Sequence, residues 1–114
     1  MIMLVAMCCL LPLLNGCAPL ELQGSFEGKF SICDGTISQE NYRITFFGDG
    51  RGRTVSTLTD TDECFTYSVS GDTIAVTCGK EHFQLRYSYD SENEKLMLYT
   101  KSGEDSSILS SIKE

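Results

Sequence analysis

Few side chains in this chain have both the type and the spacing that catalysis or metal binding requires. His82 is the one histidine, and it stands beside Glu81 on the polar face of an alternating run. A general base needs a partner on its own face, and a zinc site needs several ligands, yet the six cysteines form no C-x-x-C pair. Cys78 and His82 could act as nucleophile and base only if both faced one side, which the alternation opposes. The sequence therefore predicts a protein that is not an enzyme, with no metal and no cofactor.

Two charged runs could bind ions or charged ligands. The acidic run 60–63, Asp-Thr-Asp-Glu, could hold Ca²⁺, but it lacks the glycine and the distant glutamate of a known calcium loop. We interpret it as a polar turn. Arg51 and Arg53 alternate with glycines, so they could meet an acidic ligand group or protect an edge strand against aggregation. Both interpretations stay open.

Length and charge limit the function further. A chain of 114 residues has room for one domain, and its formal net charge is −7. Nucleic-acid binding needs a basic surface, so the sequence predicts no nucleic-acid partner. The acidity also argues against a polybasic module that binds membrane surfaces.

The first residues are typical of an export signal. Residues 1–14 carry no charge and are almost wholly apolar. About 20 apolar residues are needed to span a bilayer, so this run has the length of a signal-peptide core instead. A buried helix is the alternative, which Pro12 opposes. No lysine or arginine precedes the run, which departs from the usual signal pattern. We expect residues 1–16 to be a signal peptide.

Leu14-Asn15-Gly16-Cys17 resembles the bacterial lipobox, in which an apolar residue, a small or polar residue, and glycine or alanine precede a cysteine. The resemblance implies cleavage before Cys17 and acyl chains such as palmitate on that residue. Several acyl chains give stable anchoring, so Cys17 would attach residues 17–23, a short tether, to a membrane. The implied location is the cell envelope, at the outer membrane or cell surface and facing an oxidising compartment. A chance cysteine after a secretory signal cut near Ala18 is the alternative.

The rest of the chain alternates apolar and polar residues with a period of two, which predicts antiparallel strands with one buried face. The turn pairs are Asp34-Gly35, Asp49-Gly50 and Gly71-Asp72. The clearest runs cover residues 24–32, 41–47, 63–69, 72–78, 82–89 and 95–100. We expect an all-β antiparallel meander that closes into a small barrel or half-barrel of 7–8 strands over residues 24–101. The tail, 102–114, could be a short helix, an eighth strand or a frayed end.

Four stretches resemble small bacterial lipocalin-like (calycin-type) lipoproteins. Gly24-Ser25-Phe26 is similar to their opening G-x-W, with Phe26 in the tryptophan position. The other three are "YRITFFGDGRGR", "FTYSVSGDTIAVT" and "LRYSYDSENEKLMLYT". The resemblance covers residues 24–100. It implies an exported, non-catalytic β-barrel that binds a small apolar ligand or a protein.

Tyrosines on the inward face suggest where a ligand would bind. A dry interior rarely holds several tyrosines, because each hydroxyl needs a hydrogen-bond partner. We expect Tyr42, Tyr67, Tyr87 and Tyr89 to line the open end of the barrel and contact a small apolar or amphipathic ligand. The alternative is a protein-binding module, an inhibitor or an envelope scaffold component, that uses an outer face or a strand edge.

Three cysteines follow Cys17, so at most one disulfide forms among them. Pairing the strands across Gly71-Asp72 points Cys78 into the core and Cys64 outward. Cys33 follows an inward-facing isoleucine and should also point outward. Strand parity therefore predicts a Cys33–Cys64 disulfide with Cys78 as a small buried hydrophobe, although a bulge at a strand end would change that parity.

Overall fold

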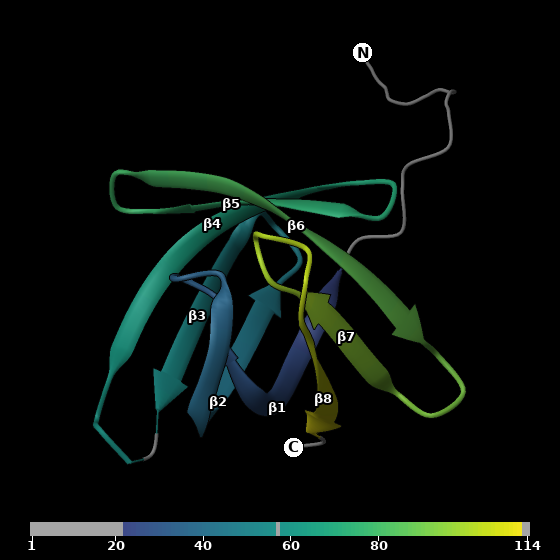
Figure 1. The fold of residues 1–114 in the computed structure, drawn as a ribbon, viewed down its shortest axis with the longest axis horizontal. Coiled ribbons are helices and arrows are strands. Elements are labelled where there is room, and N and C mark those ends of the chain that lie inside the picture. The colour runs from purple at the N-terminus through teal and green to yellow at the C-terminus, as the bar shows by residue number, and fades with distance from the viewer. Residues whose placement is uncertain (1–21, 57, 113–114) are drawn as a thin grey trace.

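The computed structural model describes residues 22–56 and 58–112, which form an eight-stranded closed antiparallel barrel with no helix (Figure 1). This confirms the all-β meander. The predicted signal peptide, Cys17 and most of the predicted tether lie outside the described residues. The strands follow one another around the barrel in the same order as along the chain. They are β1 (Gln23–Ser31), β2 (Thr36–Phe47), β3 (Arg51–Ser56), β4 (Asp62–Ser70), β5 (Thr73–Cys78), β6 (Glu81–Asp90), β7 (Lys95–Tyr99) and β8 (Ser106–Ile112).

The alternation of apolar and polar residues places the core as the sequence predicts. The β4–β5 hairpin turns on Gly71-Asp72 with Ser70 opposite Thr73, and Gly71 has φ +61°. Glycine at that position suits the mirror-image turns that match the twist of two strands. The resulting register pairs Val69 with Ile74. Inward residues of both strands therefore meet in the core.

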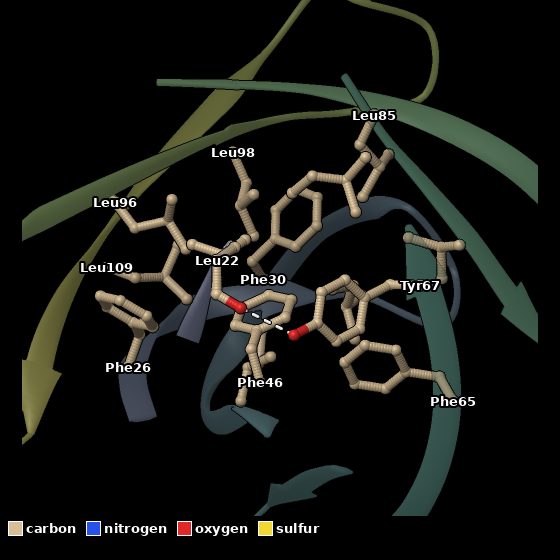
Figure 2. Packing of buried hydrophobic residues seen from close by; sticks show 14 residues of the cluster. Leu22, Phe26, Phe30, Phe46, Phe65, Tyr67, Leu85, Leu96, Leu98 and Leu109 are labelled. Carbon is tan, nitrogen blue, oxygen red and sulfur yellow. Dashed lines mark hydrogen bonds between the residues drawn. The ribbon is translucent and has the colours of Figure 1, made fainter. Parts of the chain in front are cut away.

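Side chains fill the interior of the barrel. Figure 2 shows the cluster, in which Leu85, Leu96 and Leu98 lie above the aromatic rings. Eight strands enclose a space just wide enough for side chains or one small ligand. The fourteen buried members are Leu22, Phe26, Phe30, Ile32, Ile44, Phe46, Phe65, Tyr67, Ile74, Val76, Leu85, Leu96, Leu98 and Leu109.

Small residues on the inner face of β3 make room for this core. Gly52, Thr54 and Ser56 are all buried there. A Cβ atom at Gly52 would collide with the ring of Phe65, which therefore packs closely against the glycine. An aromatic ring that covers a glycine on the neighbouring strand compensates for the missing side chain.

Strand β8 closes the barrel by pairing with both β7 and β1. The barrel therefore continues to Ile112, past residue 101 where the sequence patterns become ambiguous, and the tail contains a strand. Leu109 is buried against Gly28, whereas Ile108 is 59% exposed. Ile108 faces solvent, whereas Ser107 and Ser111 lie on the same face of β8 as the buried Leu109. Polarity alone therefore does not reveal this strand.

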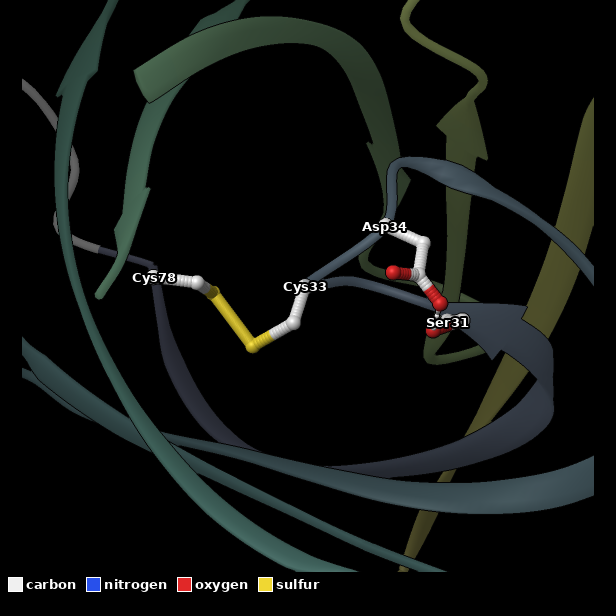
Figure 3. Close-up of a disulfide and its surroundings, with 4 residues drawn as sticks. All are labelled: Ser31, Cys33, Asp34 and Cys78. Atoms are coloured by element: carbon white, nitrogen blue, oxygen red, sulfur yellow. Dashed lines mark hydrogen bonds between the residues drawn. A yellow bond between two sulfur atoms is a disulfide. The ribbon is translucent and has the colours of Figure 1, made fainter. Parts of the chain in front are cut away.

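The disulfide joins Cys33 to Cys78, with Cα atoms 5.6 Å apart (Figure 3). The predicted Cys33–Cys64 pairing is wrong. Cys78 packs against the core and Cys64 is exposed, as strand parity predicts. The error lies at Cys33: β1 ends at Ser31, and the N–H groups of the next turn bond back to the Ser31 carbonyl. Parity does not extend through a turn, so Cys33 faces the core.

Removing the disulfide should lower the free energy of unfolding substantially. Cys33 and Cys78 are 45 residues apart, and closing a loop of that length removes about 4 kcal/mol of unfolded-state entropy at 25 °C. We expect the double variant Cys33→Ala/Cys78→Ala to lose about this amount in urea denaturation. Cys64→Ala is the matched control and should stay within about 0.5 kcal/mol of the parent. A comparable loss in the control would contradict the pairing.

Candidate functional site

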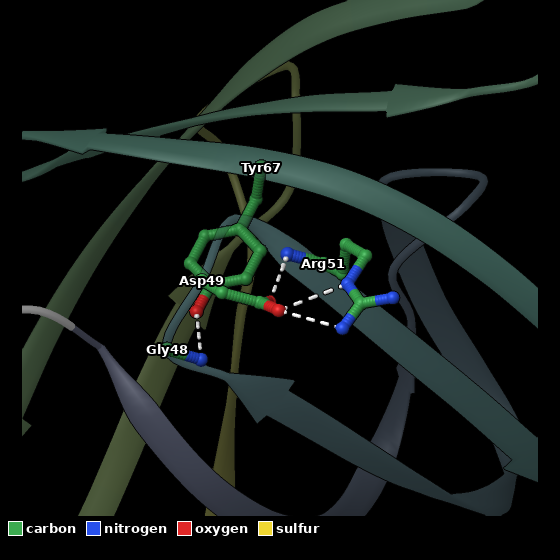
Figure 4. Close-up of polar contacts among 4 residues, drawn as sticks. All are labelled: Gly48, Asp49, Arg51 and Tyr67. Carbon is green, nitrogen blue, oxygen red and sulfur yellow. Dashed lines mark hydrogen bonds and ion pairs between the residues drawn. The ribbon is translucent and has the colours of Figure 1, made fainter.

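The four tyrosines assigned to an open end have different environments. Tyr67 is buried, and its hydroxyl donates to the carbonyl oxygen of Leu22 at 2.7 Å and accepts from the N–H of Gly48 at 3.0 Å (Figures 2 and 4). Its ring also packs edge-on against Phe46. These contacts tie the start of β1 to the β2–β3 turn. Tyr67 therefore has a structural role in the core.

The other three tyrosines are more accessible. Tyr42 is half-buried, and its pKa is raised, chiefly by burial and then by a hydrogen bond to the carboxylate of Glu40. Tyr87 is half-buried against the core. Tyr89 is 39% exposed, with its ring edge-on to Phe26 at 6.0 Å between centroids. A ligand-binding role for the set stays a prediction.

One hollow lies on the outer wall of the barrel. We call it the wall pocket, and its volume is about 500 Å³. Strand register positions its polar residues in one row, with Arg51 of β3 opposite Thr66 of β4 and Thr66 opposite Thr77 of β5. The lining residues are Phe47, Arg51, Gly52, Cys64, Phe65, Thr66, Thr77 and Gly79.

Aromatic rings supply the apolar part of the wall pocket. Phe47 follows the buried Phe46 on β2, so alternation turns it outward, where it is 49% exposed. Phe65 also lines the pocket, although its side chain belongs to the core and is 3% exposed. The exposed aromatic surface of the pocket thus comes from Phe47, and the pocket borders the core at Phe65.

Polar groups form the rim of the wall pocket. The guanidinium of Arg51 donates to the carboxylate of Asp49 through Nε at 2.9 Å and Nη2 at 2.7 Å (Figure 4). These hydrogen bonds hold the pKa of Asp49 below its ordinary value, so the pair stays ionised. The hydroxyl of Thr77 lies 3.1 Å from Nδ1 of His82. His82 is an exposed strand residue, as the sequence predicts. The rim therefore combines a cation with hydroxyl groups.

Arg51 and Arg53 do not lie on an edge strand. β3 pairs with β2 on one side and β4 on the other, so the edge-protection interpretation of Arg51 and Arg53 is wrong. Arg53 donates two hydrogen bonds, at 2.8 and 2.6 Å, to the carboxylate of Asp62. These bonds lower the pKa of Asp62. Arg51 alone of the two lines the wall pocket.

A second hollow lies next to the wall pocket and shares Cys64 and Gly79 with it. We call it the cysteine hollow, and its volume is about 380 Å³. Both cysteines of the disulfide line it. The full lining is Cys33, Asp34, Glu63, Cys64, Cys78 and Gly79.

Sequence reasoning missed both hollows because each is formed by residues from separate strands. One signal was present, since two consecutive phenylalanines, Phe46 and Phe47, cannot both face the interior of a strand. Across residues 22–56 and 58–112, His, Cys, Asp and Glu side chains form no group of three or more that could hold a metal ion. That part of the chain also has no helix with the length and apolar character needed to cross a membrane.

Comparisons with known protein families, with curated proteins and with solved structures found no match to this chain. The resemblance to lipocalin-like lipoproteins therefore stays a prediction. The barrel has the architecture that this resemblance implies.

Replacing Tyr67 by phenylalanine should destabilise the barrel. The variant leaves the Leu22 carbonyl and the Gly48 N–H without their hydroxyl partner in a buried site, which should cost about 1–3 kcal/mol in urea denaturation. Tyr89→Phe is the matched control, because this ring is partly exposed, and should change stability by less than about 0.5 kcal/mol. Equal effects from both variants would contradict the structural role of Tyr67.

Proposed function

We propose that this protein is an exported, lipid-anchored β-barrel binding protein whose wall pocket holds a small amphipathic ligand. One observation carries the proposal: side chains fill the barrel interior, while a hollow of about 500 Å³ lies on the outer wall. Ligand sites are usually hollows of roughly 300–1,000 Å³ with apolar linings and a few polar groups. The wall pocket has that size and that lining.

The chemistry of the lining suggests the orientation of the ligand. Its apolar part would lie against the exposed ring of Phe47. Its polar part would meet the guanidinium of Arg51 and the hydroxyls of Thr66 and Thr77. Arg51 uses Nε and Nη2 for Asp49, which leaves Nη1 to face a ligand oxygen.

A protein partner is the second candidate for the same surface. Phe47 presents nearly half of its area at the rim of the wall pocket, and an exposed aromatic side chain beside a pocket is typical of binding hot spots. A side chain of the partner would then occupy the pocket.

Export and anchoring are supported by the sequence and by the disulfide. Cys17 ends a lipobox-like motif, and Leu22, the first described residue, is five positions further along the chain. The Cys33–Cys78 disulfide is compatible with an oxidising compartment. A tether this short would hold the barrel close to the membrane surface.

Filling the wall pocket should block binding of an amphipathic probe. The probe is 8-anilino-1-naphthalenesulfonate, whose fluorescence rises when it leaves water for an apolar site. We expect the described barrel to bind one equivalent, and Thr66→Trp to weaken this binding at least tenfold because the indole occupies the pocket. Fluorescence titration measures both.

The matched control is Ser68→Trp, which places the same side chain on the same outer face of β4, two residues away and outside the lining. It should bind the probe within about twofold of the parent, since the pocket stays open. Equal binding by Thr66→Trp and the parent would refute the wall pocket as the site. Loss of binding in both tryptophan variants would assign the effect to the β4 face as a whole.

The anchor has its own test. In a bacterium that matures lipoproteins, we expect the full chain to be recovered with the membranes as a species that begins at Cys17 and carries acyl mass, labelled by radioactive palmitate. Cys17→Ser should abolish both label and membrane association, because a single thiol carries the diacylglyceryl group. A soluble, unlipidated parent species that begins near Ala18 would refute the anchor and leave the wall-pocket proposal intact.

A further inference from the structure

The cysteine hollow contains a free thiol beside a disulfide. Cys64 is exposed and free, and it lines the same hollow as Cys33 and Cys78. Strand register supports this proximity: Thr66 of β4 is opposite Thr77 of β5, so continuing the ladder by two residues places Cys64 beside Gly79. Gly79 directly follows Cys78. All three sulfur-bearing residues therefore converge at one end of the barrel.

The backbone determines which sulfur Cys64 can attack productively. Cys64 and Cys78 lie on adjacent strands but on opposite faces, so a bond between them would require a shift of register. Cys33 lies in the turn after β1, outside any ladder of strand hydrogen bonds. Movement of Cys33 would thus leave the strand pairing intact.

We propose that Cys33, Cys64 and Cys78 form a thiol–disulfide exchange site, in which the disulfide moves between Cys33–Cys78 and Cys33–Cys64. The Cys64 thiolate attacks Sγ of Cys33, a new S–S bond forms, and the Cys33–Cys78 bond breaks. Cys78 leaves as a thiolate and takes up the proton that Cys64 released. One S–S bond replaces another, so no oxidant or reductant is needed.

The two products differ in which thiol is accessible. In the observed form the free thiol, Cys64, is exposed on the wall, whereas in the exchanged form it is Cys78, which packs against the core. Cys64 also lines the wall pocket. In the exchanged form, Cys64 in the pocket lining would be bonded to the turn at Cys33. The exchange would therefore change the shape of the wall pocket. The exchange site itself stands independently of the proposed ligand.

Charged groups surround the attacking sulfur from each packed element. Arg53 of β3 is opposite Cys64 and is paired with Asp62. The carboxylates of Glu63 on β4 and Asp34 in the β1–β2 turn line the hollow. The reaction should accelerate as pH rises, because only the thiolate attacks a disulfide.

Native protein without added thiol provides the test. Samples held at pH 6.5, 7.0, 7.5 and 8.0 are quenched in acid, alkylated with N-ethylmaleimide and digested with trypsin and chymotrypsin. Chymotrypsin cleaves after Phe65 and so separates Cys64 from Cys78, which share one tryptic peptide. We expect a Cys33–Cys64 peptide with alkylated Cys78, formed faster at each higher pH. Alkylation confined to Cys64 at every pH and time would overturn the proposal.

Three serine variants separate the steps. Cys64→Ser should keep Cys33–Cys78 and show no alkylation, which makes it the control for spurious exchange. Cys78→Ser should form Cys33–Cys64, and Cys33→Ser should leave two free thiols. A folded Cys78→Ser protein with two free thiols, or a Cys64–Cys78 disulfide in Cys33→Ser, would overturn the assignment. If circular dichroism shows either variant unfolded, the experiment on the parent protein decides.

Discussion

Closure of the sheet is the constraint on which the other features of this barrel depend. An open meander leaves two edges with unpaired backbone groups, and here the pairing of β1 with β8 removes them. Closure also fixes the interior volume, because the strand number sets the diameter. Once the eight strands are closed, every second residue must fit into a space that has no outlet for excess volume. The glycines opposite large side chains, Gly28 against Leu109 and Gly52 against Phe65, are direct results.

A filled interior moves the binding surface to the outside. In a barrel with an open cup, function and core compete for the same inward positions. In this chain the inward positions are occupied by the core, and outward positions on β2 to β5 form the wall pocket. Gly52 and Phe65 belong to both sides, because they are buried in the barrel and also line the pocket. A change of core packing at Phe65 would therefore alter the pocket surface as well.

The sequence predicted whatever depends on alternation within a strand. The turn at Gly71-Asp72, its register, and the opposite directions of Cys64 and Cys78 follow from period two and a glycine with positive φ. Prediction failed at Cys33, where alternation stopped, and it left β8 open as one of three possibilities for the tail. Cys33 lies in a turn, and β8 has an isoleucine outside and serines inside.

The site was harder to predict than the fold for a related reason. Residues of the wall pocket are far apart in sequence and meet only through the cross-strand ladder, as Arg51 meets Thr66. The sequence of one strand does not indicate which outward residues of the neighbouring strand will lie beside it. The inward tyrosines suggested an open end, but the hydroxyl of Tyr67 finds its partners in the backbone of Leu22 and Gly48.

The hydrogen bond between Tyr67 and Leu22 also determines how the barrel responds to force. Leu22 is the point at which the N-terminal segment enters the fold, and its carbonyl is fastened to β4 before β1 begins. A pull on that segment first loads this bond and then β1, which is held by β2 on one side and β8 on the other. Because β1 would have to slide along both neighbours, many hydrogen bonds share the load at once. The point at which the chain enters the barrel is thus held by contacts to β2, β4 and β8 together.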